Sequence, residues 1–141
     1  LRVSNKKIYF DEDIWELQGT HDGYLKEYGI LHQRNIKFIP KELKYIGEDR
    51  IICKKDFKKI GFDIRFHLMP ETNAIKTQDK KSILLQLKKS GWKFTCDSKS
   101  FGVEQGLYFG KKDVFTENKN IYINGEIIKE EEVINWELKK I

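Results

Sequence analysis

The stretch Gly61 to Met69, GFDIRFHLM, carries the clearest structural signal in the sequence. Apolar side chains occupy every second position: Phe62, Ile64, Phe66 and Leu68. Polar or charged side chains occupy the positions between them: Asp63, Arg65 and His67. Successive side chains of a β-strand point to opposite faces, so this pattern predicts a strand with one apolar and one polar face. We expect the apolar face to lie in the core, with Arg65 and His67 pointing away from it.

Alternation of the same kind predicts short strands along the rest of the chain, at intervals of about ten residues. The expected strands cover residues 6–10, 13–20, 30–39, 43–53, 74–78, 83–87, 92–96, 103–109, 115–123 and 133–140. An acidic turn at Asp11 and Glu12 joins the first two as a hairpin, and Pro40 ends the segment 30–39. Many short strands separated by turn residues are typical of an all-β fold, an antiparallel β-sandwich or barrel.

Three places in this pattern are less regular. The residues from His21 to Gly29 are expected to form a connection between two strands. Gly47 interrupts the segment 43–53, which indicates a strand pair or a bulged strand. The segment Glu126 to Glu132, EIIKEEE, is the one place where a short helix competes with a strand. We find no internal repeat or linker, so residues 1–141 are expected to form a single domain.

The composition sets limits on partners. The chain has 27 basic and 22 acidic residues, a net charge of +5, which is compatible with an anionic partner or with the lysine bias of an AT-rich genome. It lacks the aromatic-flanked basic motifs of RNA-binding sheets, so no nucleic-acid partner is expected. No apolar run is long enough for membrane insertion, and no signal peptide is visible. Cys53 and Cys96 have no metal-binding spacing and are interpreted as free thiols, with one long-range disulfide as the alternative.

Several polar residues stand out as candidates for a substrate-facing surface or a structural polar network. They are His21, Asp22, Tyr24, His32, Arg34, Arg65 and His67. His32 with Arg34, and Arg65 with His67, each share one face of a strand, opposite the core residues at the alternate positions. Two such strands side by side would form a basic patch for an acidic polysaccharide. The alternative is a hydrogen-bonded network with Asp49, Asp63 or Glu48.

The sequence nominates no catalytic residue. His21 and His32 are separated by a glycine-containing connection, and neither an HxH nor an HExxH pair is present, so no metal ligand is predicted. No nucleophile motif accompanies the serines or cysteines. The acidic residues are scattered along strands, and no two of them can be paired as the carboxylates of a glycosidase. We therefore expect no cofactor in this chain.

Several short motifs nevertheless follow one another along the chain in the same order as in a known protein family. The motifs are THDGY (20–24), LHQR (31–34), GEDR (47–50), IRFHL (64–68) followed by Pro70, GWKF (91–94), the segment 103–110 and INWEL (134–138). In this order the chain resembles, over nearly its whole length, the C-terminal β-domain of heparinase II/III-like polysaccharide lyases. The resemblance implies the later strands of the family's antiparallel β super-sandwich.

The resemblance also carries functional expectations. Family members join an N-terminal α/α toroid to β-sheets and cleave acidic polysaccharides, such as heparan sulfate or alginate, by β-elimination. The family's catalytic Asn, His and Tyr groups lie on the toroid, and its zinc or calcium ligands lie upstream of the matched region. We therefore expect a piece of a longer chain, inactive alone, whose partners are the missing toroid and an acidic polysaccharide.

Two further expectations follow from the same resemblance. The family implies a location in the cell envelope or periplasm, or secretion. The competing hypothesis is a non-catalytic carbohydrate-binding or structural β-module, in which aromatic side chains such as Trp15, Trp92 or Tyr24 stack on sugar rings.

Overall fold

The computed structural model describes residues 1–55 and 59–141. In these residues the chain forms eleven strands and two single-turn helices. The strands are β1 (Val3–Phe10), β2 (Trp15–Tyr24), β3 (Ile30–Ile39), β4 (Lys44–Cys53), β5 (Ile60–His67), β6 (Asn73–Lys76), β7 (Ile83–Gln86), β8 (Gly91–Cys96), β9 (Phe101–Lys111), β10 (Val114–Ile127) and β11 (Glu131–Lys140). The helices are α1 (Leu25–Tyr28) and the 3-10 turn η1 (Pro40–Glu42).

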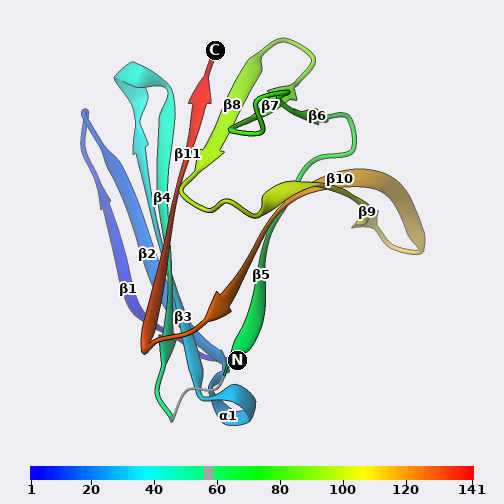
Figure 1. The fold of residues 1–141 in the computed structure, drawn as a ribbon. Helices are drawn as coiled ribbons and strands as arrows, with labels where there is room; N and C mark the ends of the chain where they lie inside the picture. The colour runs from blue at the N-terminus through cyan, green and yellow to red at the C-terminus, as the bar shows by residue number, and fades with distance from the viewer. Residues whose placement is uncertain (56–58) are drawn as a thin grey trace.

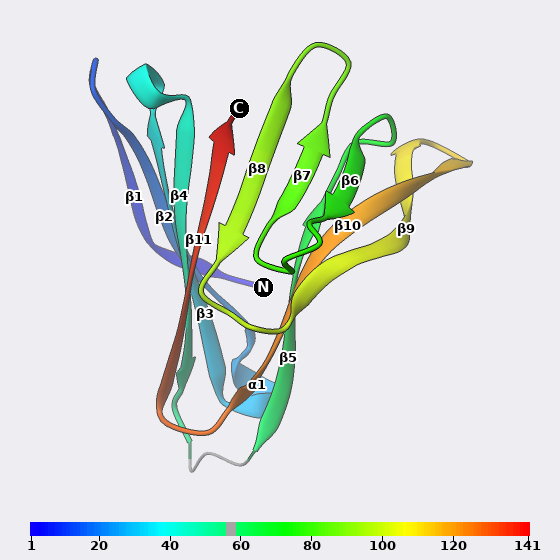
Figure 2. The ribbon, with the colours of Figure 1, turned by 45° about the horizontal axis from the view of Figure 1, so that its top comes forward.

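The strands form two antiparallel sheets of unequal size. The large sheet has the order β1-β2-β3-β4-β11-β8-β7-β6, and the small sheet has the order β5-β10-β9. Figure 1 shows β1 to β4 and β11 as a tall layer, with β5 running along the opposite side of the molecule. Figure 2 shows β8, β7 and β6 continuing the large sheet beyond β11. The expected all-β antiparallel sandwich is therefore confirmed.

The register of the large sheet defines its two faces. Opposed residues in an antiparallel pair share a face. One continuous row joins Ile8, Leu17, Ile36, Gly47 and Trp136, and a second joins Phe10, Trp15, Phe38, Tyr45, Leu138 and Phe94. We call the side that carries these rows the inner face. The opposite, outer face carries ion pairs such as Lys7 with Glu16 and Arg50 with Glu48, as expected for a surface in water.

The core lies where the small sheet covers the inner face. Its buried members are Ile64, Ala74, Ile83, Leu85, Phe94, Phe101, Ile121, Ile123 and Trp136. Phe66 of β5 packs against two of them, with ring centroids 5.5 Å from Phe94 and 5.0 Å from Trp136. Burial of this apolar surface supplies the main driving force for holding the two sheets together.

Several predictions from the sequence are confirmed by these elements. In β5 the apolar residues Phe62, Ile64 and Phe66 turn inward, while Arg65 and His67 are exposed. The segment Ile30–Ile39 is a strand ended by Pro40, which opens η1. The hairpin around Asp11 is also present, and the Asp11 carboxylate stabilises its turn by accepting hydrogen bonds from the backbone N–H groups of Asp13 and Ile14.

One expectation about local structure is wrong, and one alternative that the sequence left open is decided. The connection predicted from His21 is still strand, because β2 continues to Tyr24 and reaches β3 through a register shift between His21 and Tyr24. The single-turn helix α1 follows it and ends at Gly29, which has a φ of 72° that glycine adopts without strain. The segment Glu126 to Glu132 is not helical. Its ends belong to β10 and β11, because pairing with β5 and β4 outweighs local helix propensity.

Gly47 does not interrupt its strand, which corrects another expectation. The strand β4 pairs with β3 and β11 in unbroken register through this residue. The reason for glycine is a close approach, since a Cβ at this position would lie 1.9 Å from Cε2 of Trp136. The Trp136 indole thus lies flat over the backbone of β4, and only a residue without a side chain leaves it room.

We predict that Gly47→Ala destabilises the domain by about 1–3 kcal/mol, because the new methyl group forces the Trp136 ring out of a packed core. The measurement is the free energy of unfolding in urea. Gly61→Ala is the matched control in β5, where the nearest atom to a new Cβ is the Gly125 carbonyl oxygen at 3.9 Å. Equal stability of the two variants would contradict the packing explanation.

Candidate functional site

The strand β3 places two of the candidate residues on the inner face of the large sheet. His32 and Arg34 share that face with Ile30 and Ile36, because all four lie at alternate positions of one strand. The sequence had predicted that these two side chains point away from the core residues, and this is wrong. The strand therefore brings a base and a permanent cation against the interior of the domain.

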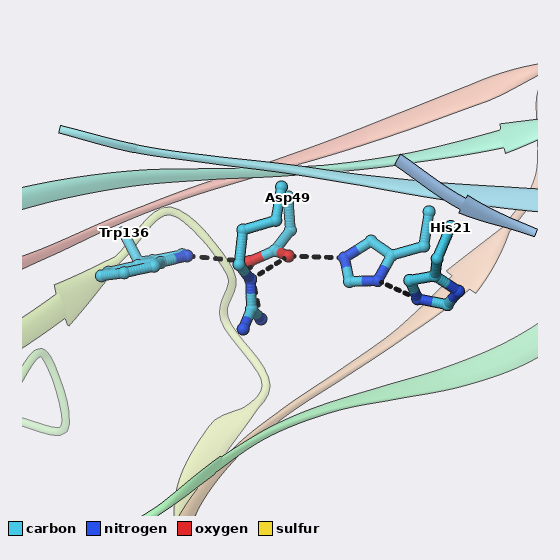
Figure 3. Close-up of polar contacts among 5 residues, drawn as sticks. His21, Asp49 and Trp136 are labelled. Atoms are coloured by element: carbon cyan, nitrogen blue, oxygen red, sulfur yellow. Dashed lines mark hydrogen bonds and ion pairs between the residues drawn. The ribbon is translucent and has the colours of Figure 1, made fainter. Parts of the chain in front are cut away.

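The reason for this placement is Asp49 on the adjacent strand β4. Its side chain is fully buried, with 0% of its surface exposed, and it lies opposite Arg34 in the sheet. One oxygen, Oδ1, accepts hydrogen bonds from Nε2 of His32 at 2.5 Å and Nε of Arg34 at 2.7 Å. The other, Oδ2, accepts from Nη2 of Arg34 at 3.2 Å and Nε1 of Trp136 at 2.8 Å. Figure 3 shows Trp136 and His21 at opposite ends of this network.

The hydrogen bonds fix the protonation pattern of both histidines. A carboxylate only accepts, so Nε2 of His32 carries a proton and Nδ1 is left to accept from Nε2 of His21 at 3.0 Å. The other nitrogen of His21 in turn accepts from the backbone N–H of Gly23 at 3.3 Å. Every donor in the chain from Gly23 to Asp49 thus points toward the carboxylate, and both imidazoles are neutral.

The environment shifts the pKa values of two members of the network. Burial alone would raise the pKa of Asp49, but the hydrogen bonds from His32, Arg34 and Trp136 and the charge of Arg34 outweigh it and hold the pKa below the usual 3.8. Burial and the neighbouring His32 lower the pKa of His21 below its usual 6.5. Both shifts favour the ionised carboxylate and the neutral imidazole that the hydrogen bonds require.

An open pocket of about 600 Å³ lies beside the network, between β3 and β5. Polar side chains from both strands and from the region of α1 line it: Tyr24, Tyr28, His32, Arg34, Asp63 and Arg65. Its floor is apolar and includes Ile30, Ile51 and Ile127. Tyr24 and Tyr28 remain about half exposed, at 51% and 47%, and the Tyr24 ring lies 5.4 Å from that of His21. The pocket therefore combines exposed aromatic rings with charged groups.

The remaining candidate residues lie apart from this network. Asp22 accepts a hydrogen bond from the backbone N–H of Arg2 at 2.7 Å and so fastens the start of β1. Arg65 reaches the pocket edge but donates to Glu104 at 2.7 Å and pairs with Asp63 at 3.4 Å. His67 bonds Asn120 of β10 through Nδ1 at 3.0 Å.

The strands β3 and β5 are not neighbours in one sheet, as the expected basic patch required, because they belong to different sheets. His32, Arg34 and Arg65 nevertheless line the same pocket between them, whereas His67 is not part of its lining. The three lining side chains make hydrogen bonds and ion pairs with carboxylates, as the alternative interpretation from the sequence expected. Asp49 binds His32 and Arg34, Asp63 binds Arg65, and Glu48 pairs with Arg50 on the outer face.

The described part of the chain shows how the potential metal ligands and the two thiols are placed. Residues 1–55 and 59–141 contain no group of three His, Cys, Asp or Glu side chains arranged to hold a metal ion. Both nitrogens of His32 are engaged in hydrogen bonds, so this ring has no free lone pair for a ligand bond. Cys53 and Cys96 are both free thiols, each half-buried.

In residues 1–55 and 59–141, no helix has the length and apolar character needed to span a membrane.

Sequence reasoning named Asp49 only as one of three possible partners of a polar network, and it missed Trp136 as a donor. A signal for Asp49 was present, because it alternates with Tyr45, Gly47 and Ile51 at core-facing positions of one strand. A charged residue at such a position requires partners. For Trp136 no local signal exists, since 87 positions separate it from Asp49.

We predict that Asp49→Ala lowers the free energy of unfolding at neutral pH by about 3–5 kcal/mol, because it leaves Arg34 and Trp136 without their buried acceptor. Asp13→Ala is the control, since Asp13 pairs with Lys41 while 73% of its side chain is exposed. This variant is expected to lose less than about 1 kcal/mol. A similarly small loss for Asp49→Ala would show that the network does not stabilise the fold.

We also predict that His21→Gln flattens the rise of stability with pH below 6.5. Where the pKa of His21 is lower in the folded than in the unfolded chain, the unfolded state binds more protons, so stability falls as the solution becomes more acidic. Glutamine keeps a donor and an acceptor but does not titrate. Urea unfolding of both proteins between about pH 5 and 8 measures the difference. Parallel curves across that range would contradict the shift.

With this geometry in place, comparisons with known proteins identify the family. Residues 2–137 match the family model described as heparinase II/III-like, C-terminal. A heparan sulfate lyase HepC mutant from Pedobacter heparinus superposes with a TM-score of 0.79 at 13% identity, over 99% of this chain and 22% of that one. A heparinase III gene product superposes with a TM-score of 0.78 at 15% identity, over 99% and 21%. No curated protein sequence matches significantly.

Because their identity to this chain is low, these two structures establish the fold alone. The chain spans about a fifth of the length of each. The family model covers all but five of the 141 residues, so the expected resemblance is confirmed. The chain belongs to the family of heparinase II/III-like C-terminal domains.

Proposed function

We propose that this chain is the β-domain of a polysaccharide lyase that acts by β-elimination on acidic, uronate-containing polysaccharides. The observation that carries the proposal is the family match over residues 2–137. The superposition on a heparan sulfate lyase over 99% of this chain supports it. A polysaccharide of this kind is found outside the cytoplasm, so the proposal includes a place in the cell envelope, in the periplasm or among secreted proteins.

The role that we assign to this domain is structural support for one wall of the substrate cleft. The pocket beside β3 supports this assignment, because it presents the half-exposed Tyr24 and Tyr28 next to Arg34 and Arg65. Aromatic rings stack on sugar rings, and guanidinium groups bind carboxylates or sulfates. Hydrogen bonds to Asp49 and Glu104 hold these two arginines in place.

Catalysis itself is assigned to the rest of a longer protein. β-Elimination requires a group that neutralises the uronate carboxylate, a base that removes the C5 proton and an acid that protonates the leaving oxygen. His21 and His32 are poorly suited to this task, because each uses both ring nitrogens in the hydrogen-bond chain to Asp49. We assign no metal or cofactor to these residues. Any zinc or calcium would be held by upstream residues, as the family resemblance implies.

The expected outcome is therefore activity in the longer protein and none in residues 1–141 alone. Elimination leaves an unsaturated uronate that absorbs in the near ultraviolet, which allows turnover to be followed directly. We expect the longer protein to act on at least one of heparan sulfate, alginate and hyaluronan. The isolated chain should show no turnover on any of them, with or without zinc, because we assign no positioned base to residues 1–55 and 59–141.

The cleft-wall role is tested in the same assay. Tyr24→Ala in the longer protein should raise KM by about 2- to 10-fold with little change in kcat, because a stacking contact is lost in ground and transition states alike. Phe115→Ala is the control, an aromatic residue on β10 that is 62% exposed and lies outside the pocket lining. Turnover by the isolated chain that disappears on replacing His32 or His67 would overturn the assignment of catalysis.

The second candidate function is a non-catalytic carbohydrate-binding module. The observation that favours it is the exposure of Tyr24 at 51% and Trp15 at 54%. Trp92, the third aromatic residue considered from the sequence, packs against the core. Polysaccharide binding by the longer protein without any turnover would favour the module over the lyase.

A further inference from the structure

A β-bulge in β2 lies at the edge of the pocket. The strand pairs with β3 at His21 and again at Tyr24, and the register shifts between these two residues. Asp22 and Gly23 form the bulge, and Gly23 donates its backbone N–H to Nδ1 of His21 at 3.3 Å. Asp22 accepts from the backbone N–H of Arg2 on the other side. The hydrogen bond from Gly23 to His21 therefore helps to define the course of the chain into Tyr24.

The residues that follow the bulge supply the aromatic part of the pocket. Tyr24 is the N-cap of α1, and Tyr28 is the last residue of that helix. Both line the pocket and are about half exposed. The Tyr24 ring also lies 5.4 Å from the ring of His21. A change in the shape of the bulge would therefore move both aromatic rings relative to Arg34 on β3.

The hydrogen bond within the bulge requires a neutral His21, which lies at the outer end of the network in Figure 3. Nδ1 of this ring accepts from Gly23, and Nε2 donates to His32 at 3.0 Å. A proton added to Nδ1 would place two donors against each other, because the ring nitrogen and the Gly23 nitrogen would both carry hydrogen. Protonation thus removes the bond to Gly23 and retains the donation to His32. The effect is confined to the bulge and leaves the hydrogen bonds of Asp49 in place.

The groups around His21 determine when it takes up this proton. Burial is the largest effect and lowers the pKa of His21 below its usual 6.5, His32 and Arg34 act in the same direction, and Asp22 opposes them. The other titratable or charged groups on the neighbouring elements are Tyr24 on β2, Asp49 on β4, Arg2 before β1 and the exposed Lys26, Glu27 and Tyr28 of α1. His21 is therefore neutral at neutral pH and becomes protonated below pH 6.5.

We propose that His21 is a pH-dependent switch of the pocket, which holds the bulge and Tyr24 in the ligand-binding position when neutral and releases them when protonated. The pocket is then formed at neutral pH and loosened in acid. Such a switch needs an element that can change its arrangement locally. The bulge and α1 meet this requirement, because Tyr24 is half exposed and α1 contributes no buried residue to the core.

The ligand-binding part of this inference rests on the proposed function, which supplies an acidic polysaccharide as the occupant of the pocket. The conformational part rests only on the hydrogen bonds of His21. The two parts are therefore measured separately, in the longer protein.

The first measurement is hydrogen exchange with mass spectrometry at about pH 5 and about pH 7.5, corrected for the intrinsic pH dependence of exchange. We expect the protection of residues 22–28 to fall about fivefold or more in acid, relative to residues 60–67 of β5. His21→Gln should abolish this loss, because glutamine keeps a donor and an acceptor but does not titrate. His67→Gln is the matched control, a histidine outside the pocket lining, and should retain it.

The second measurement is KM for heparan sulfate in the same three proteins, with Kd taken instead where no turnover occurs. Between the same two pH values, KM of the unsubstituted protein should rise about fivefold or more beyond the change seen in His21→Gln. His67→Gln should follow the unsubstituted protein. Changes of kcat that all three proteins share report on other titrating groups.

The contrary results are distinct. Unchanged protection of residues 22–28 in acid would overturn the switch, and so would an equal loss of protection in His21→Gln. The comparison with residues 60–67 in the unsubstituted protein needs no variant to fold. Loss of protection without any effect on KM or Kd would overturn the link to the pocket. Loss of protection in a protein that neither cleaves nor binds polysaccharide would leave the conformational switch in place and remove the proposed function.

Discussion

The arrangement of this domain depends on the hydrogen bonds that the buried Asp49 carboxylate accepts. Its four hydrogen bonds join β3, β4 and β11 at the centre of the large sheet. The small sheet is linked to the same point, because the guanidinium of Arg34 lies 4.9 Å from the centroid of the Phe66 ring on β5. A fully buried charge is tolerated only where its partners are complete. The carboxylate therefore specifies which strands must meet, whereas apolar burial specifies only that they pack.

Much of the fold was predictable because alternation is a local property. The period of two in Gly61–Met69 and Ile30–Ile39 indicated both the strands and, for the first, the correct faces. Gly47 was misjudged and the segment Glu126 to Glu132 was left open, and both have a common reason. Each is determined by residues distant in sequence, the Trp136 ring in one case and the pairing of β10 and β11 in the other. A local pattern also could not predict which strands belong to which of the two sheets.

The candidate site was predictable in its residue types, and the sequence offered Asp49 only as one of three possible partners. His32 and Arg34 stood out as polar positions in an apolar strand, but only the register of β3 against β4 brings them to Asp49. Arg65 and His67 had the same pattern on a strand of the other sheet, where they meet Glu104 and Asn120 instead. A similar sequence pattern thus produced a buried network in one place and exposed pairs in another. The difference lies in what the opposing strand supplies.

The position of β11 has a consequence for the order in which the domain assembles during synthesis. This strand is the last of the 141 residues to leave the ribosome, yet it lies between β4 and β8 in the middle of the large sheet. Until it arrives, β1 to β4 and β6 to β8 are two separate ribbons, and Asp49 lacks the Trp136 donor. Pairings this distant in sequence form slowly. In the nascent chain, the edges of β4 and β8 therefore stay unpaired until β11 has been made and joins them into one sheet.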